Sequence, residues 1–378
     1  MSDDLSSLLA LNALPKIGPI RIRRLLKHFG APATILSRSD TQLQEVSGIG
    51  PEIASIITRW RELTDPEAEL ALCERHQISI LTARSPLWPT SLTKSQDSPL
   101  LLYVKGELLP EDQSAFAIVG SRRCSHYGRA ATRRFSSTLA HAGYTIISGL
   151  ARGIDTEAHE AALEAKGRTV AVLGSGLLQL YPAENKDLAR RIIDGHGAIV
   201  SEFPLRCPPD KQTFPQRNRI VANWCTGLLV TECPRRSGSL ITANMASEAG
   251  RPIFAIPGPI DQPNSEGCHD LIREGCALVT HPEQIIKDLQ EQPLFDFAKQ
   301  APRKTDAQSP SVQLPPPPKP ILNETEDLIY QQLSSNEMTM DQIAEMTSLP
   351  IHRISATLLG LEMKGLAKQL SGQKYIKT

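Results

Sequence analysis

Short apolar runs rich in β-branched residues alternate with helical stretches between residues 66 and 290. Segments with amphipathic spacing, such as Arg129–Ala142 and Ser239–Ala249, lie between most of these runs. Such alternation is typical of βαβ units. The sequence therefore predicts an α/β core with an extended Rossmann-like sheet, doubly wound and mostly parallel. The candidate strands are Ile78–Leu81, Leu100–Val104, Phe116–Val119, Thr145–Ile147, Val170–Leu173, Ile199–Ser201, Leu228–Thr231, Ile253–Ile256 and Leu278–Val279.

Glycine, serine and arginine follow five of these strands. Ligands of an open parallel sheet bind beyond the carboxyl ends of its strands. Glycine lets the backbone approach an anion, serine donates a hydrogen bond, and arginine binds phosphate oxygens in a fork. The pattern predicts an anion pocket at this edge. The stretches are Gly120-Ser121-Arg122-Arg123, Ser148-Gly149-Leu150-Ala151-Arg152-Gly153, Gly174-Ser175-Gly176, Arg235-Arg236-Ser237-Gly238 and Pro257-Gly258.

The segment from Lys211 to Arg219 combines an aromatic residue with several cations at the start of a predicted helix. Phe214 in this setting suits base stacking beside phosphate contacts. Its alternative role is a hydrophobic staple at the helix entry. Arg217 is expected to bind phosphate. Otherwise, one of Arg217 and Arg219 faces solvent and the other pairs with Glu202.

Several catalytic classes lack their motifs. There is no Gly-x-Gly-x-x-Gly after the first strand and no Gly-x-x-x-x-Gly-Lys-Ser/Thr, which weakens the dinucleotide and P-loop interpretations. Asp155 and His159 have the spacing of a helix face, but we expect an N-cap and a surface or packed histidine. Ser237 is not in a nucleophile elbow. The sequence predicts no catalytic residue, metal or cofactor.

Residues 1 to 65 contain two similar turns, Leu14–Pro19 and Val46–Pro51, each followed by a helical segment. The pair resembles a tandem helix-hairpin-helix (SAM-like) module, in which helix N-termini bind phosphate. The alternative is a helical module that contacts only protein.

Two further segments follow the core. Residues 291 to 320 are rich in proline, as expected for a semi-rigid linker. Residues 321 to 378 show three helical segments and a hairpin, which suggest a winged helix. Its seven acidic and five basic residues favour docking to protein at least as much as DNA reading.

The composition sets broad limits. The chain has 378 residues and a formal net charge of zero, so bulk charge indicates no polyanion partner. Seven dispersed cysteines without a Cys-x-x-Cys pair predict neither disulfides nor a structural zinc. The apolar runs are too short to span a membrane and the start lacks a signal-peptide pattern, so we expect a cytoplasmic protein with no membrane partner.

The core resembles the DprA/Smf family of bacterial DNA-processing proteins, from Phe116 to roughly Val279. The longer members of this family also have a helical front module and a winged helix. The residues that carry the resemblance are Ile118-Val119-Gly120-Ser121-Arg122, Ser148-Gly149-Leu150-Ala151-Arg152-Gly153-Ile154-Asp155, Tyr181-Pro182 with Asn185, Phe214-Pro215-Gln216-Arg217-Asn218-Arg219-Ile220, and Ser237-Gly238-Ser239-Leu240-Ile241-Thr242-Ala243.

The resemblance implies a protein that binds and protects incoming single-stranded DNA and loads the RecA recombinase during natural transformation or homologous recombination. It also implies a homodimer formed through the Rossmann-like domain. The phosphate pocket that it implies comprises Gly120, Ser121, Arg122, Gly149, Arg152, Lys211, Phe214, Arg217, Asn218, Arg219, Ser237 and Gly238. The strand-end pattern adds Arg123, Gly153 and Arg236.

Two departures from the family pattern stand out. His269, in Gly267-Cys268-His269, replaces an asparagine that is common in the family, and Trp224-Cys225 replaces Leu-Ser. The first leaves the polar role of His269 open, and we expect the second to change packing only.

The main alternative function is a Rossmann-like nucleotide phosphoribohydrolase. Its expected Pro-Gly-Gly-x-Gly-Thr stretch is absent. A third hypothesis is an interaction hub that acts through its end modules.

Overall fold

The computed structural model describes residues 2–291, 322–334, 338–347, 349–364, 366–370 and 374–377. The chain divides into two compact units, residues 1–295 and 296–378, and each is described by itself. Residues 292–320 of the predicted linker lie outside the described residues. No helix among the described residues is long and apolar enough to cross a membrane.

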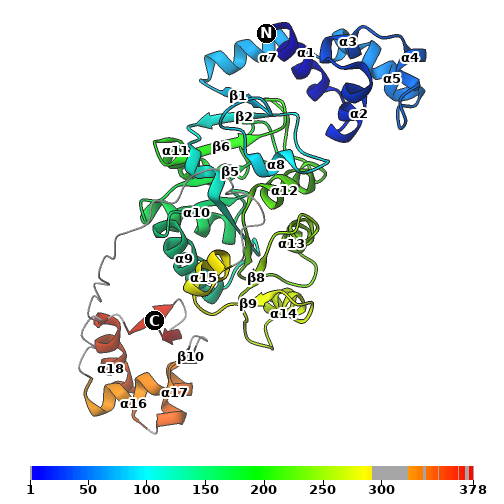
Figure 1. Ribbon diagram of the computed structural model, residues 1–378. Helices are drawn as coiled ribbons and strands as arrows, with labels where there is room; N and C mark the ends of the chain where they lie inside the picture. Colours follow the sequence, from blue (N-terminus) through cyan, green and yellow to red (C-terminus); the bar gives the residue numbers. More distant parts are fainter. Residues whose placement is uncertain are drawn as a thin grey trace, which may run out of the picture. The chain divides into compact units, whose positions relative to one another are not determined.

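The first unit is built on a nine-stranded sheet with the order β1-β2-β6-β5-β4-β3-β7-β8-β9 (Figure 1). The seven strands from β6 to β9 in this order pair in parallel, whereas β1–β2 and β2–β6 are antiparallel. The predicted doubly wound, mostly parallel sheet is confirmed. The strands are β1 (Ser79–Thr82), β2 (Leu101–Gly106), β3 (Ala115–Val119), β4 (Thr145–Ser148), β5 (Thr169–Val172), β6 (Gly197–Ser201), β7 (Leu228–Val230), β8 (Ile253–Ala255) and β9 (Ala277–Leu278).

Strand β3 is the point at which the chain changes direction across the sheet. The successive strands β4, β5 and β6 extend from one side of β3, and β7, β8 and β9 extend from the other. Connections on the two sides diverge at such a point, which leaves a crevice beyond the carboxyl ends of the strands. The predicted anion pocket is expected at this place.

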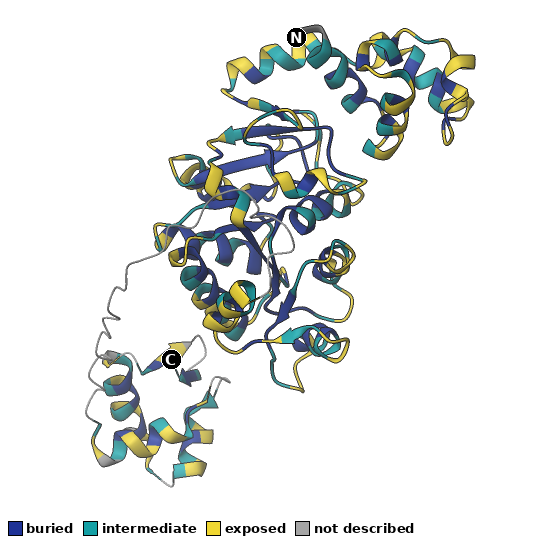
Figure 2. Cartoon of the chain, viewed as in Figure 1, coloured by how far each residue is buried: buried dark blue, intermediate teal, exposed yellow. Residues whose placement is uncertain are grey.

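Both faces of the sheet are buried under helices. Alternate strand residues point to opposite sides, and apolar residues occupy both sets of positions. Ala117 and Val119 of β3 belong to a core with one set of helices, and Phe116 and Ile118 pack with the other set. In Figure 2 the central strands are dark blue, and the helices show yellow and teal. The first set contains α8 (Thr90–Thr93), α12 (Thr213–Trp224), α13 (Gly238–Glu248) and α14 (Glu266–Arg273), and the second α9 (His126–His141), α10 (Ile154–Glu164) and α15 (Pro282–Glu291).

The side of the sheet near β6 is covered separately. Helix α11 (Lys186–Ile193) packs on β5 and β6 with Leu188 and Ile192 buried. The helix α7 (Pro66–Arg75) precedes β1. Short 3₁₀ helices occur at η1 (Pro110–Ser114), η2 (Ala183–Asn185) and η3 (Pro263–Ser265).

The front of the chain forms the expected set of short helices. Each of the two helices that follow the predicted turns begins with proline at its first position, where the missing N–H costs nothing. The second ends at Thr58, and a separate turn of helix follows. The helices are α1 (Ser2–Ala13), α2 (Pro19–Phe29), α3 (Pro32–Leu36), α4 (Asp40–Gln44), α5 (Pro51–Thr58) and α6 (Trp60–Leu63).

The front helices contact the core. Leu9 of α1 is buried in one cluster with Cys73 and Tyr103. The Asn12 Nδ2 donates to the Glu202 carbonyl at 2.8 Å, and Arg23 donates to the Ser98 carbonyl at 2.5 Å. These contacts join α1 and α2 to the antiparallel side of the sheet.

The second unit is a winged helix, as predicted. Its helices are α16 (Glu324–Gln332), α17 (Met340–Thr347) and α18 (Ile351–Met363), and its strands are β10 (Met338–Thr339), β11 (Ala367–Leu370) and β12 (Lys374–Lys377). The strand order is β10-β12-β11, so a short strand that the sequence did not predict pairs with the expected hairpin. Ile343, Ile354 and Leu358 lie in its core.

Candidate functional site

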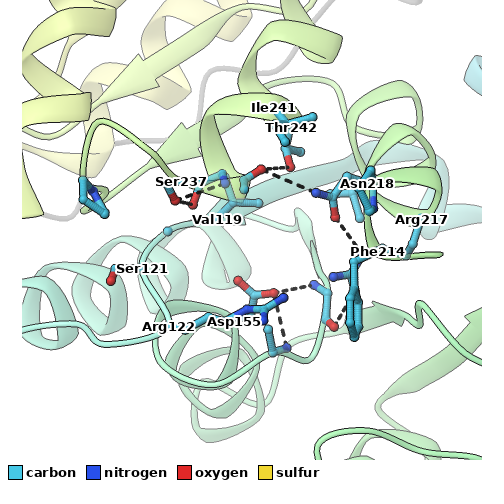
Figure 3. A pocket seen from close by; sticks show the side chains of 18 of the residues that line it. Val119, Ser121, Arg122, Asp155, Phe214, Arg217, Asn218, Ser237, Ile241 and Thr242 are labelled. Atoms are coloured by element: carbon cyan, nitrogen blue, oxygen red, sulfur yellow. Dashed lines mark hydrogen bonds between the residues drawn. The ribbon is translucent and has the colours of Figure 1, made fainter. Parts of the chain in front are cut away.

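A cavity of about 590 Å³ opens beyond β3, β4 and β7, where the strand order changes direction. In Figure 3, side chains from the loop after β3, from α10, from α12 and from α13 converge on it. All but three of the fifteen residues named for the phosphate pocket line this cavity, whereas the predicted strand ends Gly174-Ser175-Gly176 and Pro257-Gly258 do not. Those of the fifteen that line it are Gly120, Ser121, Arg122, Arg123, Gly149, Lys211, Phe214, Arg217, Asn218, Arg236, Ser237 and Gly238.

Two of the remaining three residues lie close by. Arg152 lines a smaller adjoining cavity of about 30 Å³ and forms an ion pair with Glu184. Gly153 lines neither cavity. It has φ of 75°, and a Cβ at this position would collide with the Ser121 carbonyl oxygen. Glycine at this position therefore lets the loops after β3 and β4 pack together.

Arg219 does not line the cavity, and its expected phosphate role is wrong in this respect. Its guanidinium is buried and forms an ion pair with Glu202, with Asp97 at 3.9 Å. Residues two apart on a helix point to nearly opposite sides, so Arg217 reaches the cavity and Arg219 cannot. The alternative pairing with Glu202 is confirmed. The expectation that the other arginine faces solvent is wrong, because Arg217 is also buried.

Arg217 is a buried cation with neutral partners. Its Nη1 donates to the Gly149 and Val172 carbonyls, both at 2.5 Å, and its Nε donates to Asn218 Oδ1 at 2.9 Å. It forms no ion pair within 4.0 Å among the described residues, and its Nη2 makes no hydrogen bond with them. Burial lowers the pKa of Arg217 to about 10, and the nearby Asp155 opposes this shift.

Phe214 stands on the opposite side of the cavity from α13. Its ring is half-buried, with its centroid 5.9 Å from that of Tyr181, and the Arg122 guanidinium lies 5.2 Å from the ring centroid (Figure 3). Tyr181, Phe214 and Arg122 all line the smaller adjoining cavity. An aromatic ring is thus available beside cations.

The remaining cations of the cavity have no acidic partner. Arg122, Arg123, Lys211 and Arg236 are exposed and form no ion pair within 4.0 Å with the described residues. The arginines immediately outside the cavity are paired with carboxylates: Arg129 and Arg133 with Glu157, Arg152 with Glu184, Arg219 with Glu202, and Arg235 with Asp270. These four cations therefore leave positive charge uncompensated at the cavity.

The helix α13 begins at the rim of the cavity. Ser237 caps it by accepting a hydrogen bond from the Ser239 N–H at 3.2 Å, and Gly238 is exposed, with open space where a Cβ would stand. Backbone N–H groups of a first helical turn carry partial positive charge. This rim therefore adds hydrogen-bond donors to the cationic wall.

The two candidate catalytic residues have structural environments. Asp155 is the second residue of α10, which makes the predicted N-cap wrong, and its Oδ2 accepts from the Gly149 and Ala151 N–H groups at 3.1 and 3.3 Å. His159 is buried, with Nδ1 2.6 Å from Thr169 Oγ1, and burial lowers its pKa to about 3. The packed histidine is confirmed.

The departures noted in the sequence also have defined contacts. The His269 Nε2 lies 2.9 Å from the Gly258 carbonyl oxygen and so holds the loop after β8. The Trp224 indole is buried and donates to the Asp112 carbonyl at 2.9 Å. All seven cysteines are free thiols. No group of three or more His, Cys, Asp or Glu within the described ranges could hold a metal ion.

Some cavity residues carried no sequence signal. Asn264, in the 3₁₀ helix η3, lines the cavity and donates to the Arg123 carbonyl at 2.9 Å, although it is not part of any predicted strand-end stretch. Ile241 and Thr242 also line it. The helical period counted from Gly238 places these two residues, at i+3 and i+4, on the cavity side of α13.

Residues 79–290 match the DNA recombination-mediator protein A family. The chain belongs to this family. Residues 313–373 match the DprA winged helix domain, and residues 8–59 match the SAM-like helix-hairpin-helix tandem. The resemblance seen in the sequence is confirmed.

Individual relatives agree with this assignment. Protein Smf of Escherichia coli (strain K12) is 40% identical over 306 residues, which cover 81% of this chain and 79% of that protein. The X-ray structure of DNA processing protein A (DprA) from Streptococcus pneumoniae is similar with a TM-score of 0.63 and 34% identity, covering 74% of this chain and 95% of that one. The DNA processing protein A from Helicobacter pylori, whose structure is described as showing a single-stranded DNA binding mode, has a TM-score of 0.51 and 28% identity over 57% of this chain and 96% of its own.

The Arg219 ion pair predicts a separation of stability from binding. Arg219→Ala leaves the Glu202 carboxylate buried without its cation, which costs about 3–5 kcal/mol of unfolding free energy. The affinity of the folded protein for an anionic ligand of the cavity should not change, because Arg219 does not line it. Urea denaturation measures the unfolding free energy, and binding at urea concentrations below the unfolding transition of the variant measures the affinity. A loss of affinity with unchanged stability would contradict the assignment.

Proposed function

We propose that this protein binds single-stranded DNA in the cavity beyond β3, β4 and β7 and performs no chemistry on it. One observation carries the proposal: the cations that line the cavity lack carboxylate partners, and the innermost of them, Arg217, is buried with Nη2 unused. A phosphate supplies the missing charge and accepts hydrogen bonds from guanidinium groups. The single-stranded DNA binding described for the Helicobacter pylori relative supports the same ligand here.

The aromatic side chains favour a single strand over a duplex. Phe214 and Tyr181 lie together next to Arg122 and Arg152. Unpaired bases expose faces that stack on such rings, whereas paired bases are already stacked within the helix. Rings beside the unpaired cation Arg122 suit sequence-independent binding of both phosphate and base.

The phosphoribohydrolase alternative has less support. Asp155 is the one acidic residue among those that line the cavity in the described part of the chain. Its side chain is 7% exposed and already accepts two backbone hydrogen bonds. A general acid or base must reach the reacting group, and Asp155 is engaged by the protein itself. The geometry therefore favours binding over hydrolysis.

We further propose that the chain acts as a homodimer in the cytoplasm, protects incoming single-stranded DNA and loads RecA onto it. Family membership supports this part of the proposal. The two end modules tune binding, since the cationic cavity lies within the core and the winged helix has more acidic than basic residues.

The phosphate contacts predict a salt-dependent loss of binding. Arg122→Ala or Lys211→Ala should weaken binding to fluorescent oligo-dT and lower the slope of log K against log salt by about one ion each. Fluorescence anisotropy at several salt concentrations measures both values. Arg191→Ala is the matched control, because Arg191 is exposed on α11 and does not line the cavity. Unchanged slopes in both cavity variants would refute the assignment.

Phe214 is expected to stack on a base. Phe214→Ala should cost about 1–3 kcal/mol of binding free energy to oligo-dT. Phe214→Tyr keeps the ring, so its binding free energy should lie within about 0.5 kcal/mol of the wild-type value. Thermal melting separates the alternatives. If Phe214 serves only as a staple for α12, the alanine variant melts at lower temperature while its affinity is retained.

The partner proposal predicts a dimer that acts on RecA. Light scattering should give twice the chain mass of 41.4 kDa. Substoichiometric protein should shorten the lag in RecA ATP hydrolysis on oligo-dT covered by a single-strand binding protein, and Arg122→Ala should shorten it less. A monomer mass would contradict dimerisation. If wild type and Arg122→Ala shortened the lag equally, the role of the cavity would be contradicted.

A further inference from the structure

Asp155 is an unexpected residue in a cavity built for anions. Its carboxylate lies among the side chains that line the cavity, beside Arg122 and Arg217 (Figure 3). A negative charge at this place repels a phosphate. Asp155 must therefore contribute something that outweighs this repulsion.

The carboxylate organises the loop after β4. One oxygen, Oδ2, accepts from the N–H of Gly149 at 3.1 Å and from the N–H of Ala151 at 3.3 Å. Leu150, between them, is fully buried and has φ of 54°, a left-handed conformation that a leucine rarely adopts. The two hydrogen bonds to Asp155 offset the cost of this conformation.

The same loop holds Arg217. The Gly149 carbonyl accepts from Arg217 Nη1 at 2.5 Å, and a Cβ on Gly149 would collide with that nitrogen. The Gly149 carbonyl belongs to the peptide between Gly149 and Leu150, which lies between the two peptides whose N–H groups Asp155 binds. The contact with Arg217 therefore depends on a peptide that Asp155 fixes from both sides. With Nη1 and Nε satisfied by the protein, Nη2 is the edge of the guanidinium that remains for a ligand.

We propose that Asp155 is a positioning residue for DNA binding: by holding the Gly149 and Ala151 amides, it fixes the Gly149 carbonyl and so directs Arg217 Nη2 to a phosphate. The inference rests on the proposed function of the cavity. It extends that function because Asp155, whose charge would repel a phosphate, is assigned a role that supports phosphate binding.

Electrostatics within the buried pair agree with this role. Burial raises the pKa of Asp155, and Arg217 and the two amide hydrogen bonds oppose the rise. Burial lowers the pKa of Arg217, which Asp155 opposes in turn. Each group favours the charged form of the other.

The test measures oligo-dT binding by the full-length chain and four cavity variants: Asp155→Ala, Asp155→Asn, Arg217→Lys and the double variant of Asp155→Ala with Arg217→Lys. Asp155→Ala leaves two amides without an acceptor and should weaken binding on the order of tenfold. Arg217→Lys removes the group that Asp155 positions, so Asp155→Ala should add less than about threefold in that background. Asp155→Asn keeps an acceptor oxygen without the charge and should bind within about threefold of wild type.

Asp112→Asn is the matched control. Asp112 is another buried carboxylate, paired with Arg168 and outside the cavity, so its loss should lower the melting temperature without changing affinity below the transition. If Asp112→Asn lost as much affinity as Asp155→Ala, the effect would be general destabilisation, and the proposal would be overturned.

Three further outcomes would overturn the proposal. Asp155→Ala or Asp155→Asn could bind more tightly than wild type, which would mean that repulsion dominates. The losses from Asp155→Ala and Arg217→Lys could multiply, which would mean that the residues act independently. Asp155→Asn could lose as much affinity as is expected for Asp155→Ala, which would mean that the charge of Asp155, not its hydrogen bonds, supports binding. If Asp155→Ala does not fold, the affinity of Asp155→Asn decides the question. Failure of the wild-type chain to bind oligo-dT would instead refute the function of the cavity.

Discussion

The buried guanidinium of Arg217 joins three separate parts of the core. Its hydrogen-bond partners are the carbonyl of Gly149 after β4, the carbonyl of Val172 at the end of β5, and the side chain of Asn218 on α12. A buried cation with unsatisfied donors would be strongly destabilising. The first turns of α12 must therefore lie across the ends of these two strands, and this placement brings Phe214 to the wall of the cavity.

Charge in the core is sorted by position. Five arginines outside the cavity are paired with carboxylates, namely Arg129, Arg133, Arg152, Arg219 and Arg235, whereas those that line it are left to the solvent or, for Arg217, to carbonyl oxygens. A chain with no net charge can still attract a polyanion in this way, because the local potential depends on the nearest charges and salt screens the distant ones. The binding surface therefore results from the absence of acidic partners as much as from the presence of arginine.

Helix α12 also connects the cavity to the front of the chain. Arg217 and Arg219 lie on nearly opposite sides of it, and Arg219 reaches Glu202, whose carbonyl accepts a hydrogen bond from Asn12 of α1. The pair Arg219–Glu202 is buried, so breaking it costs more than breaking an exposed pair. The front helices thus pack next to the element that carries the aromatic and cationic groups of the cavity.

The amino-acid sequence by itself determined the alternation of strands and helices, the Gly-Ser-Arg stretches after β3, β4 and β7, and the family, because strand period, turn chemistry and motif order are local properties. It could not determine which of Arg217 and Arg219 faces the cavity, that Asp155 binds backbone amides rather than capping α10, or that Asn264 joins the wall. Each of these depends on which strand ends and loops lie next to one another. That arrangement exists only once the sheet order places β3 between β4 and β7 and the buried polar groups find their partners.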